Sequence, residues 1–261
     1  MMDRKELTTL LRHPTIVLPH KHILLLSHMR GLTSLLSHII GSHPRVSGYY
    51  EQHIGYYSWR SMVRARLLYH IDHPEERRTP LYFDKLLHNG QGLSGRILRD
   101  RRIRLIFMLR KPEDSIRSIA KLHGKRNRGH RYGNPEGAAQ YYIDRLAMLQ
   151  HFAEVAGMEQ GSVYIDAEAI TENTEEALNR LTTYLGLQPA LSREYKVFKH
   201  TGTTGKGDMS KNLREGVVAR KTADGEAPQI DIAPEILERA QEKYANARNV
   251  MLNVCKGVIA K

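Results

Sequence analysis

The chain has 261 residues, and its 41% hydrophobic and 26% charged residues exclude a disordered or collagen-like protein. Lys and Arg outnumber Asp and Glu by 40 to 28, which gives a formal net charge of +12 and favours an anionic partner. A single cysteine, Cys255, excludes an intrachain disulfide and a thiolate metal cluster. The sequence shows neither a signal peptide nor an apolar run of about 20 residues, so we expect a soluble cytoplasmic protein.

The first predicted unit is a strand, a tight loop and a helix. The segment HILLLS (22–27) is short, apolar and bounded by polar residues, which is typical of a buried parallel strand. From Thr33 onward the apolar residues recur at helical spacing, and GSHP (41–44) supplies the signal that ends the helix.

Two further units repeat this order. RLIFML (104–109) predicts a strand followed by a helix that begins at Pro112, and SVYID (162–166) begins a unit whose helix ends at Gly186. The other expected elements are a helix over 56–72, a strand over 81–84 and a helix over 136–156. Alternating strands and helices predict one α/β domain over residues 1–261, with a central, mostly parallel sheet flanked by helices.

Two segments show no periodicity and are expected to be loops. One is basic and glycine-rich (123–137), and the other is rich in glycine and lysine (199–228). Loops of this length commonly act as lids or binding loops. The first can either grip an anionic acceptor or remain a solvated loop.

A candidate anion site lies between the first strand and its helix. A loop that enters a helix leaves backbone N–H groups unpaired, and the helix dipole favours negative charge there. Arg30 adds a permanent charge, and Thr33 and Ser34 add hydroxyl donors. The alternative is that Thr33 only caps the helix and Arg30 is solvated. The loop lacks the Gly-Lys-[Ser/Thr] of a nucleotide-binding P-loop, which weakens a kinase assignment.

A second pair of phosphate-binding groups follows the strand over 104–109. Arg110 ends this strand, and Ser118 follows eight residues later on the next helix. Arg offers a planar fork to a phosphate and Ser a short donor. Taken alone, however, the pair is better explained by an ordinary surface arginine and an ordinary helix serine.

These two elements, in this order, resemble the signatures of the sulfotransferases that use 3′-phosphoadenosine-5′-phosphosulfate. The resemblance implies a P-loop-NTPase-like sulfotransferase fold. It also implies that the first loop cradles the sulfonated 5′-phosphate and that Arg110 and Ser118 hold the 3′-phosphate. The first loop comprises Arg30, Gly31, Leu32, Thr33 and Ser34, with Leu32 at a position that is usually glycine.

The resemblance extends to later segments. VYIDAEAITENTEEALNRLTTYLGL (163–187) is similar to the family segment in which a tyrosine contacts adenine, which implies that role for Tyr164. GKGDMSKNLREG (205–216) looks like the C-terminal loop that covers the nucleotide, with Arg214 and Gly216 at matching positions.

Transfer of a sulfonyl group to a hydroxyl requires a base and positive groups near the leaving oxygen. In the bacterial and Golgi-type branch of the family the base is a Glu shortly after the HP that ends the first helix, which implies Glu51 here. His53 is the rival for this role, because imidazole titrates near neutral pH. Lys85 resembles a family lysine that stabilises the transferring group.

The predicted function is therefore a soluble sulfotransferase. The resemblance implies 3′-phosphoadenosine-5′-phosphosulfate as donor, 3′-phosphoadenosine 5′-phosphate as product, no metal, and a small-molecule, carbohydrate or lipid acceptor with a hydroxyl. One alternative is an atypical P-loop kinase with Asp84 as its magnesium ligand. A less favoured alternative is a basic nucleic-acid-binding protein, for which the sequence shows no recognised motif.

Overall fold

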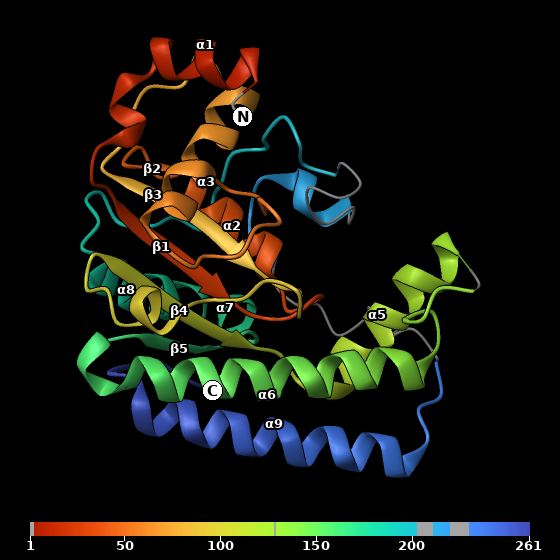
Figure 1. Cartoon of the computed structure of the whole chain (residues 1–261). Helices are drawn as coiled ribbons and strands as arrows, with labels where there is room; N and C mark the ends of the chain where they lie inside the picture. The colour runs from red at the N-terminus through yellow and green to blue at the C-terminus, as the bar shows by residue number, and fades with distance from the viewer. Residues whose placement is uncertain (1–2, 128, 203–210, 220–229) are drawn as a thin grey trace.

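The computed structural model describes residues 3–127, 129–202, 211–219 and 230–261. Within these ranges six parallel strands form one sheet in the order β2-β3-β1-β4-β5-β6 (Figure 1). The strands are β1 (Lys21–Leu26), β2 (Val46–Ser47), β3 (Leu81–Leu86), β4 (Ile103–Leu109), β5 (Val163–Asp166) and β6 (Gly257–Ile259). The predicted parallel sheet flanked by helices is confirmed.

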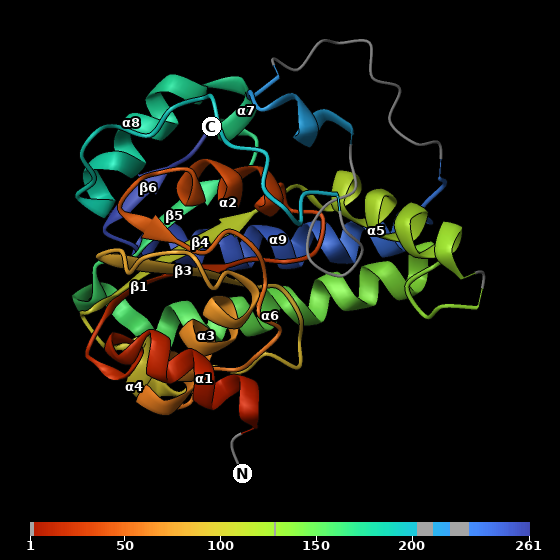
Figure 2. The same cartoon turned by 90° about the horizontal axis from the view of Figure 1, so that it is seen from above.

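Helices cover both faces of the sheet (Figure 2). One face packs against α3 (Trp59–Asp72), α4 (Gly95–Leu98), α5 (Pro112–Arg126), α6 (Pro135–Gln160) and α9 (Pro234–Val254). The other face packs against α2 (Thr33–Gly41), α7 (Ala169–Glu172) and α8 (Thr174–Leu185). Side chains alternate along each strand, so Leu24 and Leu26 enter one core and Ile23 and Leu25 the other. Burial on both faces explains why these strands are continuous apolar runs.

The remaining elements lie at the periphery. They are α1 (Arg4–Arg12) and the 3-10 helices η1 (Pro14–Val17) and η2 (Lys211–Glu215). The helix α1 has a capping box between Asp3 and Glu6. The long helices α6 and α9 run side by side beneath the sheet in the view of Figure 1.

Several predicted boundaries shift in the structure. The expected loop over 123–137 is wrong at both ends, because α5 continues to Arg126 and α6 begins at Pro135. Asn134 caps α6 by accepting a hydrogen bond from the N–H of Gly137, and Pro135 occupies the first helical position. In the expected loop over 199–228, residues 203–210 and 220–229 lie outside the described ranges, whereas η2 occupies part of the remainder.

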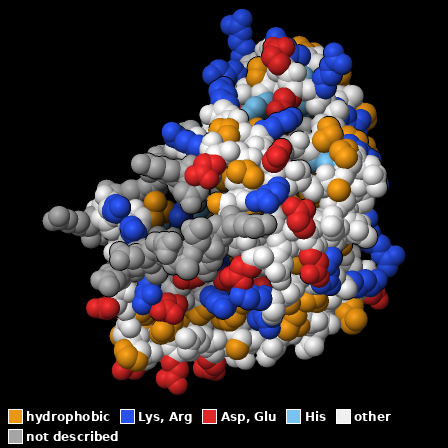
Figure 3. All heavy atoms as spheres, turned by 180° about the vertical axis from the view of Figure 1, so that it is seen from behind, with side chains coloured by type: hydrophobic (Ala, Val, Ile, Leu, Met, Phe, Trp, Pro, Cys, Tyr) orange, Lys and Arg blue, Asp and Glu red, His pale blue; other side chains and the backbone are white. Residues whose placement is uncertain are grey.

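The surface carries charges of both signs. On the face shown in Figure 3, Lys and Arg side chains are interspersed with Asp and Glu. In the described ranges no helix combines the length and the apolar character needed to cross a bilayer.

The parallel arrangement places the candidate residues together. The loops after β1, β2, β3 and β4 all leave the sheet at its carboxyl edge, and these four strands are neighbours in the sheet. Ligand sites in open parallel sheets lie at this edge.

Candidate active site

The loop between β1 and α2 has an unusual backbone. Arg30 and Leu32 adopt φ angles of 62° and 60°, a left-handed conformation that costs a non-glycine residue about 1 kcal/mol or more. Leu32 is the residue before the first turn of α2 and provides no side-chain cap. Thr33 is the first helical residue, so the alternative in which Thr33 only caps the helix is wrong. Leu32 thus offers no side-chain acceptor to the N–H groups of the first turn, which lie at the carboxyl edge of the sheet, where an anion can accept from them.

Gly31 occupies a tight position in this loop. A Cβ atom at Gly31 would lie 2.9 Å from the Oγ atom of Ser27 and 3.1 Å from the carbonyl oxygen of His28. Glycine is therefore needed here because of close packing and not because of its φ angle. The left-handed φ angles belong to the neighbouring residues Arg30 and Leu32.

The structure brings the two predicted phosphate-binding segments into contact. The Nε atom of Arg30 donates to the Oγ atom of Ser118 on α5 at 2.8 Å. The guanidinium of Arg110, at the end of β4, donates to the carbonyl oxygen of Arg30 at 3.0 Å and lies 3.4 Å from a carboxylate oxygen of Asp114. Arg30, Arg110 and Ser118 thus form one group, which we call the arginine cluster.

His28 connects the same two segments through hydrogen bonds of its imidazole ring. Its Nε2 atom accepts a hydrogen bond from the backbone N–H of Arg110 at 3.0 Å, and its Nδ1 atom lies 2.9 Å from the carbonyl oxygen of Met29. The side chain is completely buried, and burial lowers the pKa of His28 to about 4. The ring is therefore neutral and fixes the start of the β4–α5 connection against the loop after β1.

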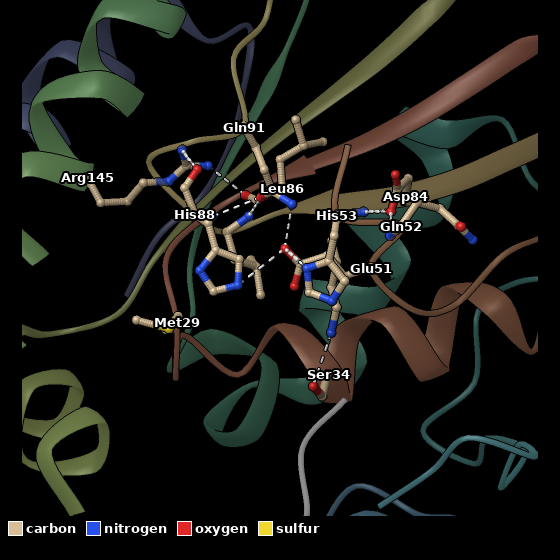
Figure 4. A network of polar contacts seen from close by, with 12 residues as sticks. Met29, Ser34, Glu51, Gln52, His53, Asp84, Leu86, His88, Gln91 and Arg145 are labelled. Atoms are coloured by element: carbon tan, nitrogen blue, oxygen red, sulfur yellow. Dashed lines mark hydrogen bonds and ion pairs between the residues drawn. The ribbon is translucent and has the colours of Figure 1, made fainter. Parts of the chain in front are cut away.

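Glu51 lies at the same edge, on the segment between β2 and α3. The residue as a whole is buried, and its Oε1 atom accepts from the Nε2 atom of Gln91 at 2.7 Å (Figure 4). The Nδ1 atom of His53 and the Nε2 atom of His88 lie 3.4 and 3.5 Å from the same oxygen. Burial acts to raise the pKa of Glu51, but the hydrogen bond from His53 and the nearby positive charges hold it below its usual value. Glu51 is therefore ionised at neutral pH.

Lys85 links this carboxylate to the first loop. The Nζ atom of Lys85 donates to the Oγ atom of Ser34 at 3.1 Å, and its charge contributes to the low pKa of Glu51. Lys85 is 2% exposed and lies near the end of β3. A cation thus lies between the candidate base and the anion site, where it can stabilise negative charge on a transferring group.

Asp84 precedes Lys85 but has a different role. One of its carboxylate oxygens accepts from the N–H groups of Gln52 and Lys85, and the other accepts from the hydroxyl of Tyr56 at 2.5 Å. Burial raises the pKa of Asp84 to about 7. Both oxygens are used to position the segment that carries Glu51, so the geometry gives no support to Asp84 as a magnesium ligand.

Two supporting residues were not predicted. Gln91 holds Glu51 and also accepts from the N–H groups of Leu87 and His88. Arg145 on α6 is completely buried and donates to the carbonyl oxygens of Ser27, Leu86 and His88, which tie the ends of β1 and β3 together. Gln91 lies in a short connection between β3 and β4, and Arg145 lies within α6. Neither position shows a sequence pattern that would indicate contacts with residues distant in the chain.

The remaining predicted residues lie apart from these groups. Tyr164 is completely buried in the core, and its hydroxyl donates to Asp166 at 2.5 Å. Asp166 in turn pairs with Arg248. The predicted contact of Tyr164 with adenine is therefore not supported by its position, because β5 points this side chain into the interior.

The C-terminal loop is described in part. Arg214 in η2 is exposed, and its guanidinium lies beside Gly202, where a Cβ atom would come within 2.7 Å of it. The neighbouring Thr201 contacts His38 on α2 through its Oγ1 atom at 2.8 Å. Gly216 adopts a φ angle of 71° and accepts from the N–H of Tyr195. The segment around Thr201 is thus placed near α2, and residues 205–210 of the predicted loop lie outside the described residues.

Comparison with solved structures shows a similarity to a sulfotransferase domain from the curacin biosynthetic pathway. The TM-score is 0.60 over 88% of this chain and 98% of that domain, at 15% sequence identity. No protein-family model and no curated protein matches the chain. At this identity the likeness establishes the fold: the chain has the parallel α/β fold of sulfotransferases, as the sequence predicted.

Proposed function

We propose that this protein is a sulfotransferase that moves the sulfonyl group of 3′-phosphoadenosine-5′-phosphosulfate to a hydroxyl of a small-molecule, carbohydrate or lipid acceptor. One observation carries the proposal. The arginine cluster, the N-terminus of α2 and a buried ionised carboxylate all lie at the carboxyl edge of four neighbouring strands. The first two groups suit a donor with two separate anionic groups, and the carboxylate suits an acceptor hydroxyl that must lose its proton.

The donor would use the two anion-binding segments at once. The first turn of α2, with Ser34 and Lys85, would bind the sulfonated 5′-phosphate. Arg110 and Ser118 would bind the 3′-phosphate, with Arg30 held between the two segments. The salt bridge of Arg110 with Asp114 supports the orientation of the guanidinium.

The transfer itself would depend on Glu51 and Lys85. Glu51 would take the proton of the acceptor hydroxyl as the acceptor oxygen forms its bond to sulfur. The bond between sulfur and the 5′-phosphate oxygen would break at the same time, and its electrons would remain on the nucleotide phosphate. Lys85 would stabilise the charge that builds on that oxygen. His53 stands 3.4 Å from Glu51 and remains the rival base.

The two alternatives have less support. A P-loop kinase requires a metal-binding acid near the loop, and the carboxylate oxygens of Asp84 are engaged elsewhere. A nucleic-acid-binding protein is expected to show a continuous basic surface, whereas acidic side chains interrupt the basic ones on the face in Figure 3.

Calorimetric titration with 3′-phosphoadenosine 5′-phosphate in metal-free buffer tests the proposal. We expect saturable binding that weakens at least tenfold in Arg110→Ala and when adenosine 5′-phosphate replaces the ligand. Arg101→Ala is the matched control, because Arg101 is an exposed arginine just before β4, at the opposite edge of the sheet. Equal affinity for the two nucleotides would contradict the assignment of the 3′-phosphate site.

A further inference from the structure

The carboxylate of Glu51 lies between two imidazoles from different segments. His53 follows Glu51 on the connection between β2 and α3, whereas His88 lies after β3 (Figure 4). The Oε1 atom of Glu51 is 3.4 Å from the Nδ1 atom of His53 and 3.5 Å from the Nε2 atom of His88. One ligand atom from each of the three residues lies within 4.8 Å of the others.

The two distances from Glu51 to the imidazole nitrogens match the spacing of ligands around a zinc ion, and the two nitrogens lie within 4.8 Å of each other. Tetrahedral Zn²⁺ with bonds of about 2.0–2.1 Å to nitrogen or oxygen places its ligand atoms about 3.3 Å apart. Two imidazoles and one carboxylate are also a donor set that Zn²⁺ prefers over harder ions such as Mg²⁺. Only small movements of the two rings would be needed to bind the ion.

The surroundings favour a site with one open position. The Glu51 side chain is 7% exposed, whereas His53 and His88 are 48% and 40% exposed. An ion can therefore enter from the side of the imidazoles and keep a water molecule as its fourth ligand. Gln91 donates to the Oε1 atom of Glu51 and fixes the orientation of the carboxylate, as supporting residues do around metal ligands.

We propose that Glu51, His53 and His88 bind Zn²⁺ and that the bound ion inhibits the enzyme. The inhibitory part rests on the proposed function, because it requires Glu51 to be the base. A carboxylate oxygen that shares its lone pair with zinc is no longer available to take the proton of an acceptor hydroxyl. The charge of Lys85 acts on the same carboxylate and opposes a second cation, so the binding should be reversible and weaker than in a closed structural zinc site.

The binding part is tested without any nucleotide. The metal-free full-length protein is titrated with Zn²⁺ against a chromophoric chelator, and with Co²⁺, whose visible absorption reports a tetrahedral site. We expect one ion per chain, with at least tenfold weaker binding in His88→Ala and in His53→Asn. Asn is chosen because residue 53 has a φ angle of 55°, which Asn tolerates. His151→Ala, an exposed histidine on α6, should bind as the unaltered protein does.

The outcomes separate this inference from the proposed function. No binding by the unaltered protein, or equal binding by the folded His53→Asn variant, would overturn the zinc site, whether or not sulfonyl transfer is observed. Zinc binding without sulfonyl transfer would leave the site in place and reject the proposed function. If transfer is observed, buffered Zn²⁺ should abolish it and a chelator should restore it. Inhibition of equal strength in His88→Ala, checked for native fold by circular dichroism, would reject the inhibitory role of the site.

Discussion

The Nε2 atom of His28 accepts a hydrogen bond from the backbone N–H of Arg110 at 3.0 Å, across a gap of 82 residues in the chain. Because a backbone N–H can only donate, this contact places the ring proton on Nδ1, which donates to the carbonyl oxygen of Met29. One neutral imidazole thus satisfies a donor after β4 and an acceptor after β1, and it aligns the two segments that carry the arginine cluster.

The first prediction concerns this contact. His28→Ala leaves the N–H of Arg110 and the carbonyl of Met29 buried without their partner, and it opens a cavity. We expect a loss of about 2–4 kcal/mol in the free energy of unfolding, measured by urea denaturation. Binding of 3′-phosphoadenosine 5′-phosphate should weaken as well. The exposed His151→Ala serves as control, and an equal stability of the two variants would show that the contact contributes little.

The second prediction is a pH dependence of stability. Burial lowers the pKa of His28 from its ordinary value of 6.5 to about 4 in the folded protein. Between these values the unfolded chain binds more protons than the folded one, so stability rises with pH. The contribution of His28 is complete above about pH 6.5 and is lost as the pH falls towards 4. Urea midpoints between pH 4.5 and 7 should therefore rise less steeply for His28→Asn than for the unaltered protein, and parallel curves would refute this assignment.

The third prediction distinguishes the two candidate bases. Glu51→Gln keeps the shape of the side chain but cannot accept a proton, so kcat for sulfonyl transfer should fall roughly 10²- to 10⁴-fold with donor binding preserved. His53→Asn should retain most of the activity. Because the pKa of Glu51 is lowered, the carboxylate stays ionised in mildly acidic solution. The rate should therefore fall only when the pH is below the usual pKa range of a carboxyl group. The exposed Glu154→Gln on α6 is the control, and a larger loss in His53→Asn would identify His53 as the base.

The fourth prediction concerns Ser118. Its Oγ atom accepts from Arg30, which leaves its own proton for a phosphate oxygen. Ser118→Ala should weaken binding of 3′-phosphoadenosine 5′-phosphate about tenfold, because a hydrogen bond to a charged group is lost. Affinity for adenosine 5′-phosphosulfate, which lacks the 3′-phosphate, should change little. The same loss for both ligands in calorimetry would indicate a general distortion of α5, and Ser192→Ala on an exposed segment is the control.

The core of the fold could be predicted from the sequence because its strands are buried on both faces. Such strands appear as continuous apolar runs, and the runs at 22–27, 104–109 and 162–166 coincide with β1, β4 and β5 within one residue at each end. Helix starts at Thr33 and Pro112 also match the structure. The strands β2 and β6 were missed, since two or three residues are too few to show a period.

The site was predictable where one short segment carries the signal. Arg30, Arg110 and Ser118 lie in two motifs, and the parallel sheet brings these motifs together. Gln91 and Arg145 act through contacts with residues distant in sequence, so no spacing indicates them. Tyr164 was assigned by similarity alone. The alternation of β5 places it in the interior, because its neighbours Val163 and Ile165 face the opposite core.

The contacts of Arg145 set a limit for protein engineering. Its guanidinium donates to the carbonyl oxygens of Ser27 and Leu86, next to the backbone hydrogen bond from the N–H of Ser27 to the same carbonyl of Leu86. Burial lowers the pKa of Arg145 to about 10, and the group still remains charged at neutral pH. Loop grafts that begin after Gln91 leave the acceptors of Arg145 and the partners of Glu51 unchanged, so the ends of β1 and β3 should stay in place. A redesign of α6 that removes this arginine is expected to release the loops after β1 and β3 from each other. A change in specificity could then not be distinguished from a loss of loop position.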